Sequence, residues 1–277
     1  MDKMRKPICV LIIALLIGTV GPVTVTAKET VLISGSTTVL PLAEAGAEAF
    51  NGGQSNYTVL VTGGGTYAGI ENIAKGKSDI AMASSKVAEL DIISSGYKFK
   101  ERLIGHDGIV IVVSKQIYDA GVTSLTKDQV KRIYSGEINN WKDLGGPDSE
   151  MLVVARENGS GTRDVFNEYI LGRKTAEMPS TCIVADSNEE MKRLINESKT
   201  AIGYLGFSYS EDGSLGVITL DGVKPTAETI KNASYELARE LYFYTYGDVK
   251  PGAQAFIDFM VGPEGQKIAK VHGFVPR

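Results

Sequence analysis

The chain has 277 residues, with 29 Lys and Arg against 33 Asp and Glu, for a formal net charge of −4. This acidic balance argues against a nucleic-acid binder, because such proteins usually present a basic surface. It leaves open a small-anion site, which can be built from local dipoles on an acidic protein. The length suits one large domain or two lobes.

The first 27 residues have the pattern of an export signal. Basic side chains precede an apolar run over 8–17, and small residues at 25–27 form a cleavage site. The run is too short for a membrane span. We therefore expect an exported chain starting near Lys28, periplasmic or at the cell surface, with the segment either cleaved or kept as a tether. Loss of residues 1–27, which carry three positive charges and one negative charge, changes the net charge from −4 to −6.

The first part of the remaining chain repeats one local design. Strand-like runs over 30–33, 57–61 and 79–83 each end in small or hydroxyl residues, and the first two lead into helical patterns. The polar residues at these strand ends are Ser36, Thr37, Thr38, Thr66 and Ser84.

The strongest anion signal follows an apolar run over 151–155. Arg156 stands at the strand end, and Ser160, Gly161 and Thr162 open a helical pattern. A helix start leaves backbone N–H groups unpaired and carries partial positive charge. A guanidinium adds a planar fork suited to two oxygens of one oxyanion. The alternative is that the turn simply caps a helix.

Two further runs connect the halves of the chain. The β-branched segment 104–113, interrupted at 105–108, resembles a crossover between lobes, and the aromatic segment 241–246 is the candidate return. An amphipathic pattern over 254–271, broken at Gly262 and Pro263, would cover the first lobe. In an α/β sheet, ligands bind where carboxyl ends of strands open on a shared crevice, so we expect the four polar turns to meet there.

The chain resembles a known family, the substrate-binding proteins of phosphate ABC transporters. Motifs in the family's order carry the resemblance over nearly the whole length after residue 27: Gly35-Ser36-Thr37-Thr38-Val39, Gly65-Thr66-Tyr67-Ala68-Gly69, Asp79-Ile80-Ala81-Met82-Ala83-Ser84, Asp107-Gly108-Ile109, Tyr134-Ser135-Gly136 with Asn140-Trp141, Arg156 with Gly159-Ser160-Gly161-Thr162-Arg163, and Gly265-Gln266-Lys267.

The resemblance implies a two-lobed α/β fold of the type II periplasmic-binding-protein class, each lobe a mixed sheet flanked by helices, joined by two crossover strands. We expect lobe 1 at 28–108 plus 241–277 and lobe 2 at 109–240. The family function implied is high-affinity binding of inorganic phosphate between the lobes and its delivery to an ABC permease in the membrane. We expect a monomer that is not an enzyme, with no cofactor, no metal and no nucleic-acid partner.

Carried over by position, the implied phosphate ligands are Ser36, Thr37, Thr38, Thr66, Ser84, Arg156, Ser160, Gly161 and Thr162. Some members have an aspartate where this chain has Ser84; that carboxylate accepts a hydrogen bond from a protonated phosphate oxygen and so rejects sulfate, which has no proton near neutral pH. Serine lacks the repulsive charge. We therefore include Asp107 as a candidate acceptor, although it can equally bond backbone at a strand end.

Three alternatives stay open. The same fold can hold another tetrahedral oxyanion, such as sulfate, molybdate or tungstate. A secreted hydrolase using Ser160 or Cys182 has little support, because the chain has only two histidines, and the adjacent pair His106 and Asp107 is poorly arranged for catalysis. Cys182 is more simply a small buried apolar residue. A phosphate sensor or scavenger without transport cannot be separated from a transport protein by sequence.

Overall fold

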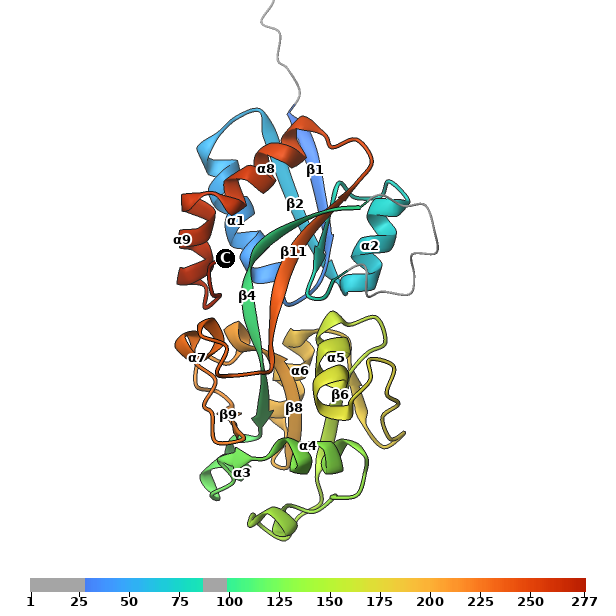
Figure 1. Cartoon of the computed structure of the whole chain (residues 1–277), viewed down its shortest axis with the longest axis vertical. Helices are drawn as coiled ribbons and strands as arrows, with labels where there is room; N and C mark the ends of the chain where they lie inside the picture. The colour runs from blue at the N-terminus through green and yellow to red at the C-terminus, as the bar shows by residue number, and fades with distance from the viewer. Residues whose placement is uncertain (1–27, 87–98) are drawn as a thin grey trace, which may run out of the picture.

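The structure, a computed structural model, describes residues 28–86 and 99–277, and it has two lobes joined by a pair of long strands (Figure 1). The expected signal segment, 1–27, lies outside the described residues. Over the described ranges, none of the helices combines the length and apolar character needed to cross a bilayer. The mixed α/β, two-lobed architecture expected from the sequence is confirmed.

Lobe 1 is built on three strands with parallel pairing. The central strand β1 (Glu29–Gly35) pairs with β2 (Tyr57–Gly64) on one side and with β3 (Ile80–Ala83) on the other. The helices of this lobe are α1 (Leu40–Gly53), α2 (Thr66–Ala74), α8 (Pro251–Val261) and α9 (Pro263–Val271). The expected amphipathic run over 254–271 is thus two helices, because Gly262 leaves the helical conformation and Pro263 starts the next helix.

Lobe 2 is built around the strand β8 (Ala201–Gly206), which pairs parallel with β6 (Leu152–Arg156), and β6 pairs parallel with β7 (Ile183–Ala185). The remaining elements of this lobe are α3 (Lys115–Asp119), β5 (Ser124–Leu125), α4 (Lys127–Tyr134), α5 (Gly161–Phe166), α6 (Asn188–Glu197), β9 (Gly216–Val217), β10 (Thr219–Leu220), α7 (Ala227–Lys231), the 3-10 turns Trp141–Leu144 and Phe207–Tyr209, and the π-helical turn Asn167–Leu171.

The lobes share one sheet through two antiparallel crossover strands, β4 (Phe99–Val113) and β11 (Ala238–Tyr246). The nine-stranded sheet runs β2-β1-β3-β11-β4-β8-β6-β7, with β9 also paired to β4. The register between the crossover strands shifts between Leu241 and Tyr242, which is a β-bulge. In Figure 1, β4 runs from the upper to the lower lobe and β11 returns beside it.

The crossover strands extend further than the sequence indicated. The expected interruption at 105–108 is absent from β4, and β11 begins at Ala238 rather than at residue 241. Two glycines explain why the pattern resembled a loop. A Cβ on Gly105 would lie 3.0 Å from the carbonyl oxygen of Val275, and a Cβ on Gly108 would lie 2.6 Å from Ile230. These glycines permit close packing inside a strand.

A small apolar cluster lies around Ile70 and Ile73 of α2, and two larger clusters form the main cores of the lobes. One includes Ile104 on β4 and Leu241 on β11, whereas the other includes Ile109 on β4 and Leu237 just before β11. The clusters therefore divide within the crossover strands. The residue boundaries given above for the two lobes stay a prediction, and this division of the core supports them.

Candidate functional site

The polar turns of lobe 1 meet at the edge of the sheet that faces lobe 2. The Ser36 hydroxyl donates to Ser84 Oγ at 3.0 Å, and the hydroxyls of Thr66 and Ser84 lie 3.3 Å apart. All three side chains are buried. They come from three chain segments: the turn after β1, the first residue of α2 and the end of β3. The parallel pairing of the strands brings these segments together.

The start of α5 in lobe 2 lies directly against this cluster. A Cβ added to Gly161 would be 2.6 Å from both Ser84 Oγ and Thr66 Oγ1, so only a glycine fits there. Ser160 is the N-cap and accepts a hydrogen bond from the N–H of Arg163 at 3.3 Å. The hydroxyls of Thr162 and Thr38, from opposite lobes, lie 3.0 Å apart. The structure therefore unites the turns at 36–38, 66, 84 and 160–162, as the sequence predicted.

Arg156 ends β6 and points its guanidinium into the same region, with only 1% of the residue exposed. Its Nε and Nη2 donate to the carboxylate of Glu157, and Nη2 also lies 3.3 Å from Thr37 Oγ1. Nη1 is buried and has no hydrogen-bond partner among the described residues. A buried guanidinium nitrogen normally has an acceptor, so this atom indicates where one is needed.

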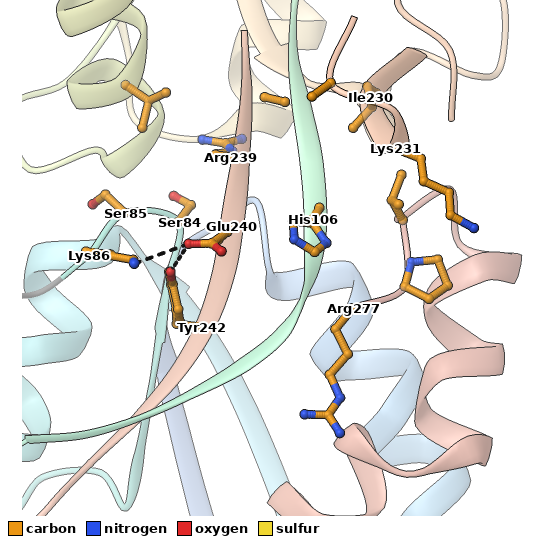
Figure 2. A pocket seen from close by; sticks show the side chains of 15 residues that line it. Ser84, Ser85, Lys86, His106, Ile230, Lys231, Arg239, Glu240, Tyr242 and Arg277 are labelled. Carbon is orange, nitrogen blue, oxygen red and sulfur yellow. Dashed lines mark hydrogen bonds and ion pairs between the residues drawn. The ribbon is translucent and has the colours of Figure 1, made fainter. Parts of the chain in front are cut away.

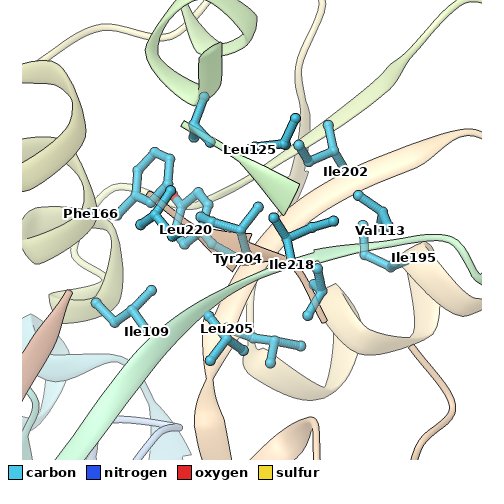
Figure 3. Close-up of a cluster of buried hydrophobic side chains, with 14 of the residues drawn as sticks. Ile109, Val113, Leu125, Phe166, Ile195, Ile202, Tyr204, Leu205, Ile218 and Leu220 are labelled. Carbon is cyan, nitrogen blue, oxygen red and sulfur yellow. The ribbon is translucent and has the colours of Figure 1, made fainter. Parts of the chain in front are cut away.

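The core of lobe 2 holds Arg156 in place. The Arg156 backbone N–H donates to the hydroxyl of Tyr204 at 3.1 Å, and the Tyr204 ring stacks on Phe166 with centroids 3.8 Å apart. Figure 3 shows both rings inside the apolar cluster. Burial raises the pKa of Tyr204 well above its ordinary value, so the hydroxyl stays neutral as an acceptor for this N–H.

A second buried arginine, Arg239 at the start of β11, was not predicted from the sequence. It donates to Thr162 Oγ1 at 2.7 Å and to Thr38 Oγ1 at 2.9 Å, so it contacts hydroxyls of both lobes. Its Nη2 also forms an ion pair with Asp107 Oδ2 at 2.8 Å, across the paired strands. The sequence signal was weak because the return strand was expected to begin two residues later. The signal that could have revealed Arg239 is its pairing with Asp107 on the neighbouring crossover strand.

Asp107 has partners on both carboxylate oxygens. Oδ2 accepts from Arg239, and Oδ1 accepts from the N–H of Phe207 at 3.1 Å. Burial raises the pKa of Asp107, and the adjacent guanidinium opposes that rise. Asp107 therefore positions Arg239, and its suggested role as an acceptor for a protonated ligand stays a prediction.

Asn188, the first residue of α6, also belongs to the site and was missed. It is fully buried, and its Nδ2 donates to Thr37 Oγ1 at 3.0 Å and to Thr38 Oγ1 at 3.1 Å. The strand at 183–185, followed by a polar turn and a helix, repeats the design of the four turns named above. Ser187 caps the helix, and this alone explains a polar turn at that place. The sequence therefore offers no separate reason to single out Asn188.

A groove of about 630 Å³ leads from the surface toward this cluster. Figure 2 shows Ser84, Ser85 and Arg239 at one side of it, with Lys86 and Tyr242 both contacting Glu240. The Ser85 hydroxyl is buried and has no partner among the described residues. The groove thus borders the polar cluster on the side of the crossover strands.

The chemistry available is that of an anion receptor. The cluster combines hydroxyls, the start of α5 and two buried guanidiniums, and each guanidinium is balanced by one carboxylate, Glu157 or Asp107. Within the described ranges, no group of three His, Cys, Asp or Glu side chains is arranged to hold a metal ion. Burial raises the pKa of the Cys182 thiol, which makes it a poor nucleophile. An oxyanion fits this donor set better than a cation or an acyl substrate.

Comparison with known proteins agrees with this assignment. A sequence profile described as the PBP superfamily domain matches residues 22–264. The phosphate-binding protein PstS of Bacillus subtilis is 32% identical over 252 residues, which cover 90% of this chain and 81% of that protein.

Two solved structures are similar throughout. One, assigned as a phosphate ABC transporter substrate-binding protein with bound phosphate, from Clostridium perfringens, has a TM-score of 0.82 and 37% identity, covering 90% of this chain and 100% of that one. The other, an ABC-type phosphate transport receptor from Vibrio cholerae, has a TM-score of 0.71 and 31% identity, covering 89% and 100%. The chain therefore belongs to the PBP superfamily and, within it, to the family of phosphate ABC transporter substrate-binding proteins.

Proposed function

We propose that this protein binds inorganic phosphate in the cleft between its lobes and delivers it to an ABC import permease. The observation that carries the proposal is the buried Nη1 of Arg156, which has no hydrogen-bond partner among the residues that the structure describes, on a guanidinium whose Nη2 lies 3.3 Å from Thr37 Oγ1 of the other lobe. The proposed ligands are Ser36, Thr37, Thr38, Thr66, Ser84, Arg156, Ser160, Gly161 and Thr162. Arg239 joins them as a second guanidinium on the crossover strand.

The physical requirement is that a dianion leaving water must regain hydrogen bonds at every oxygen. Hydrogen bonds to a charged group contribute roughly 1.5–3 kcal/mol each, so several donors can offset desolvation and the loss of ligand freedom. Donors from both lobes are needed at once, which links ligand binding to lobe closure. A permease can then distinguish the closed, loaded protein from the open, empty one.

Export and non-catalytic action belong to the same proposal. The leader-like segment at 1–27 supports a location outside the cytoplasm, where a transport receptor works. Ser160 serves as the cap of α5, and the paired arginines suit binding rather than turnover. A turnover assay with a phosphate ester tests the non-catalytic part, and release of phosphate above the buffer rate would contradict it.

The deciding experiment is calorimetric titration of the protein with phosphate, before and after Arg156→Ala. We expect the substitution to weaken phosphate binding by about 100-fold or more, because it removes the charged donor whose acceptor is the ligand. Arg193→Ala is a matched control, since Arg193 also pairs with glutamates but its side chain is 54% exposed on α6. Affinity of the Arg156 variant within threefold of the parent would refute the role of this guanidinium.

A second candidate ligand is sulfate, molybdate or tungstate on the same fold. The observation that favours it is that Ser84 contributes no charge and both oxygens of Asp107 are already engaged. Competition titrations with these anions against phosphate decide between the candidates. Displacement of phosphate at equal concentrations of sulfate would identify a general receptor for tetrahedral dianions.

A further inference from the structure

Two threonine hydroxyls of the cleft already accept as many hydrogen bonds as they can. A hydroxyl oxygen has two lone pairs and one proton. Thr37 Oγ1 accepts from Asn188 Nδ2 at 3.0 Å and from Arg156 Nη2 at 3.3 Å. Thr38 Oγ1 accepts from Asn188 Nδ2 at 3.1 Å and from Arg239 Nη2 at 2.9 Å. Each of these hydroxyls can therefore only donate its own proton to a further partner.

The neighbouring hydroxyl of Thr162 does not change this result. It accepts from Arg239 Nη1 at 2.7 Å and lies 3.0 Å from Thr38 Oγ1. If Thr38 donates to Thr162, both lone pairs of Thr162 are filled and its proton must point onward. If Thr38 does not donate to Thr162, its own proton points onward. In both arrangements the pair offers an O–H outward and Thr38 has no free lone pair, whereas in the second arrangement Thr162 keeps one.

The orientation of the Asn188 amide is itself fixed. Its Oδ1 accepts the backbone N–H of Gly206 at 3.1 Å, so its Nδ2 must face the two threonines. The side chain is fully buried at the start of α6, which leaves it no alternative partner in water. An amide rotated by 180° would set Oδ1 against hydroxyls and Nδ2 against an N–H donor.

We propose that Asn188 is a positioning residue that fixes the hydroxyls of Thr37 and Thr38 as hydrogen-bond donors, so that these two hydroxyls favour oxyanion oxygens that carry no proton. The inference rests on the proposed phosphate-binding function and deepens it. Its consequence is selection of the dianion of phosphate over the monoanion, whose additional P–OH group needs an acceptor. An acceptor for the one proton of the dianion then has to come from elsewhere in the cleft.

The charged groups around these hydroxyls come from four elements. Arg156 and Glu157 approach from the end of β6, and Arg239 approaches from β11 with Asp107 of β4 behind it. The Tyr209 hydroxyl completes the set; it lies 2.6 Å from the carbonyl oxygen of Thr37 and 2.7 Å from Glu189 Oε1 of α6, and it can donate its one proton to either. All of them are retained when only residue 188 is changed, so a comparison of pH profiles cancels their titration.

The test is the phosphate affinity of the full chain, measured by calorimetry between about pH 8 and about pH 5.5, a range that spans dianion and monoanion. For the parent we expect affinity to fall about tenfold per pH unit below the second pKa of phosphoric acid, in step with the dianion fraction. Asn188→Ala frees lone pairs on both threonines. We expect it to bind about tenfold more weakly at the upper pH and to show a clearly shallower decline.

The matched control is Asn167→Ala. Asn167 is also buried, but its Nδ2 donates to the backbone carbonyls of Lys174 and Ala176 rather than to the hydroxyls of Thr37 and Thr38. We expect this variant to keep the pH profile of the parent whatever its stability. The same steep profile in folded Asn188→Ala would overturn the inference and leave the phosphate function standing. A parent that fails to bind phosphate would overturn both.

Asn188→Asp decides the matter if the alanine variant does not fold. A carboxylate is nearly the same shape and still accepts the Gly206 N–H, but it turns both threonine protons toward itself. We expect phosphate binding to be at least about 100-fold weaker at the upper pH and to recover toward acid, as the new carboxyl gains a proton. A profile that declines toward acid like that of the parent would overturn the inference.

Discussion

At the scale of single residues, the site depends on buried charges that have partners inside the protein. Asp107 and Arg239 are almost fully buried and form an ion pair at 2.8 Å. Removing one member of such a pair leaves an uncompensated charge, which costs far more than the pair itself contributes. Asp107 is therefore expected to matter first for stability, and for ligand selection only through Arg239.

We expect Asp107→Asn to lower the free energy of unfolding by about 3–5 kcal/mol, measured by denaturant titration. The control is Asp212→Asn, because Asp212 pairs with Lys192 at 2.7 Å while 54% of its side chain is exposed. Exposed pairs contribute about 1 kcal/mol or less, so the control should barely change stability. Similar small losses in both variants would contradict the assignment. Unchanged phosphate-over-sulfate selectivity in Asp107→Asn would also remove Asp107 as a direct acceptor.

The residue scale also shows where sequence reasoning succeeded and where it did not. Residues at strand ends, such as Ser36, Ser84 and Arg156, were found because a polar residue after a buried run is a local signal. Arg239 and Asn188 were missed because their significance lies in what faces them. The role of Arg239 depends on its pairing with Asp107 on the neighbouring strand. The role of Asn188 depends on its hydrogen bonds to two threonines that lie 150 or more positions away in the sequence.

At the scale of elements, the decisive contact is the approach of α5 to the end of β3. Gly161 opens α5, and the atoms nearest to an added Cβ belong to Ser84 and Thr66 at 2.6 Å. The lobes also meet where the Tyr67 N–H at the start of α2 donates to the carbonyl of Gly159 at 3.3 Å. The start of α5 thus packs directly against hydroxyls of lobe 1, because Gly161 has no side chain.

We expect Gly161→Ala to prevent full closure and to weaken phosphate binding by about 100-fold, because a methyl group would overlap two hydroxyls. Gly52→Ala near the end of α1 is the control, since a Cβ there meets no atom within 4 Å. Calorimetry gives the affinities, and small-angle scattering with saturating phosphate reports whether the lobes still come together. Parent-like closure in Gly161→Ala would show that α5 does not approach lobe 1 this closely in the bound form.

The sequence predicted the order of elements better than their ends. The crossover strand β4 was expected to be interrupted because Gly105 and Gly108 look like turn residues, whereas they make room for Val275 and Ile230. These contacts join segments that are distant in the sequence, and no local pattern announces them. The same limit applied to 254–271, where the Gly-Pro break separates two helices.

At the scale of the whole molecule, ligand binding and stability are linked. A ligand that binds only the folded protein stabilises it by about 2.7 kcal/mol at a concentration 100 times its Kd. For a protein of this size, we expect phosphate at that concentration to raise the Tm by about 5–10 °C in calorimetric scans. Sodium chloride of equal ionic strength is the control for salt effects. No phosphate-specific rise would contradict a receptor that closes on phosphate.

The β-bulge between Leu241 and Tyr242 lies close to where the two apolar clusters divide, on a ribbon that is hydrogen-bonded on both sides of it. A pair of strands with a bulge can bend while it keeps its interstrand hydrogen bonds. We therefore expect that one lobe can rotate away from the other while both apolar cores stay intact. Release of a bound ligand would then require only that the two lobes move apart. The emptied molecule keeps its folded halves and is ready for the next round of uptake.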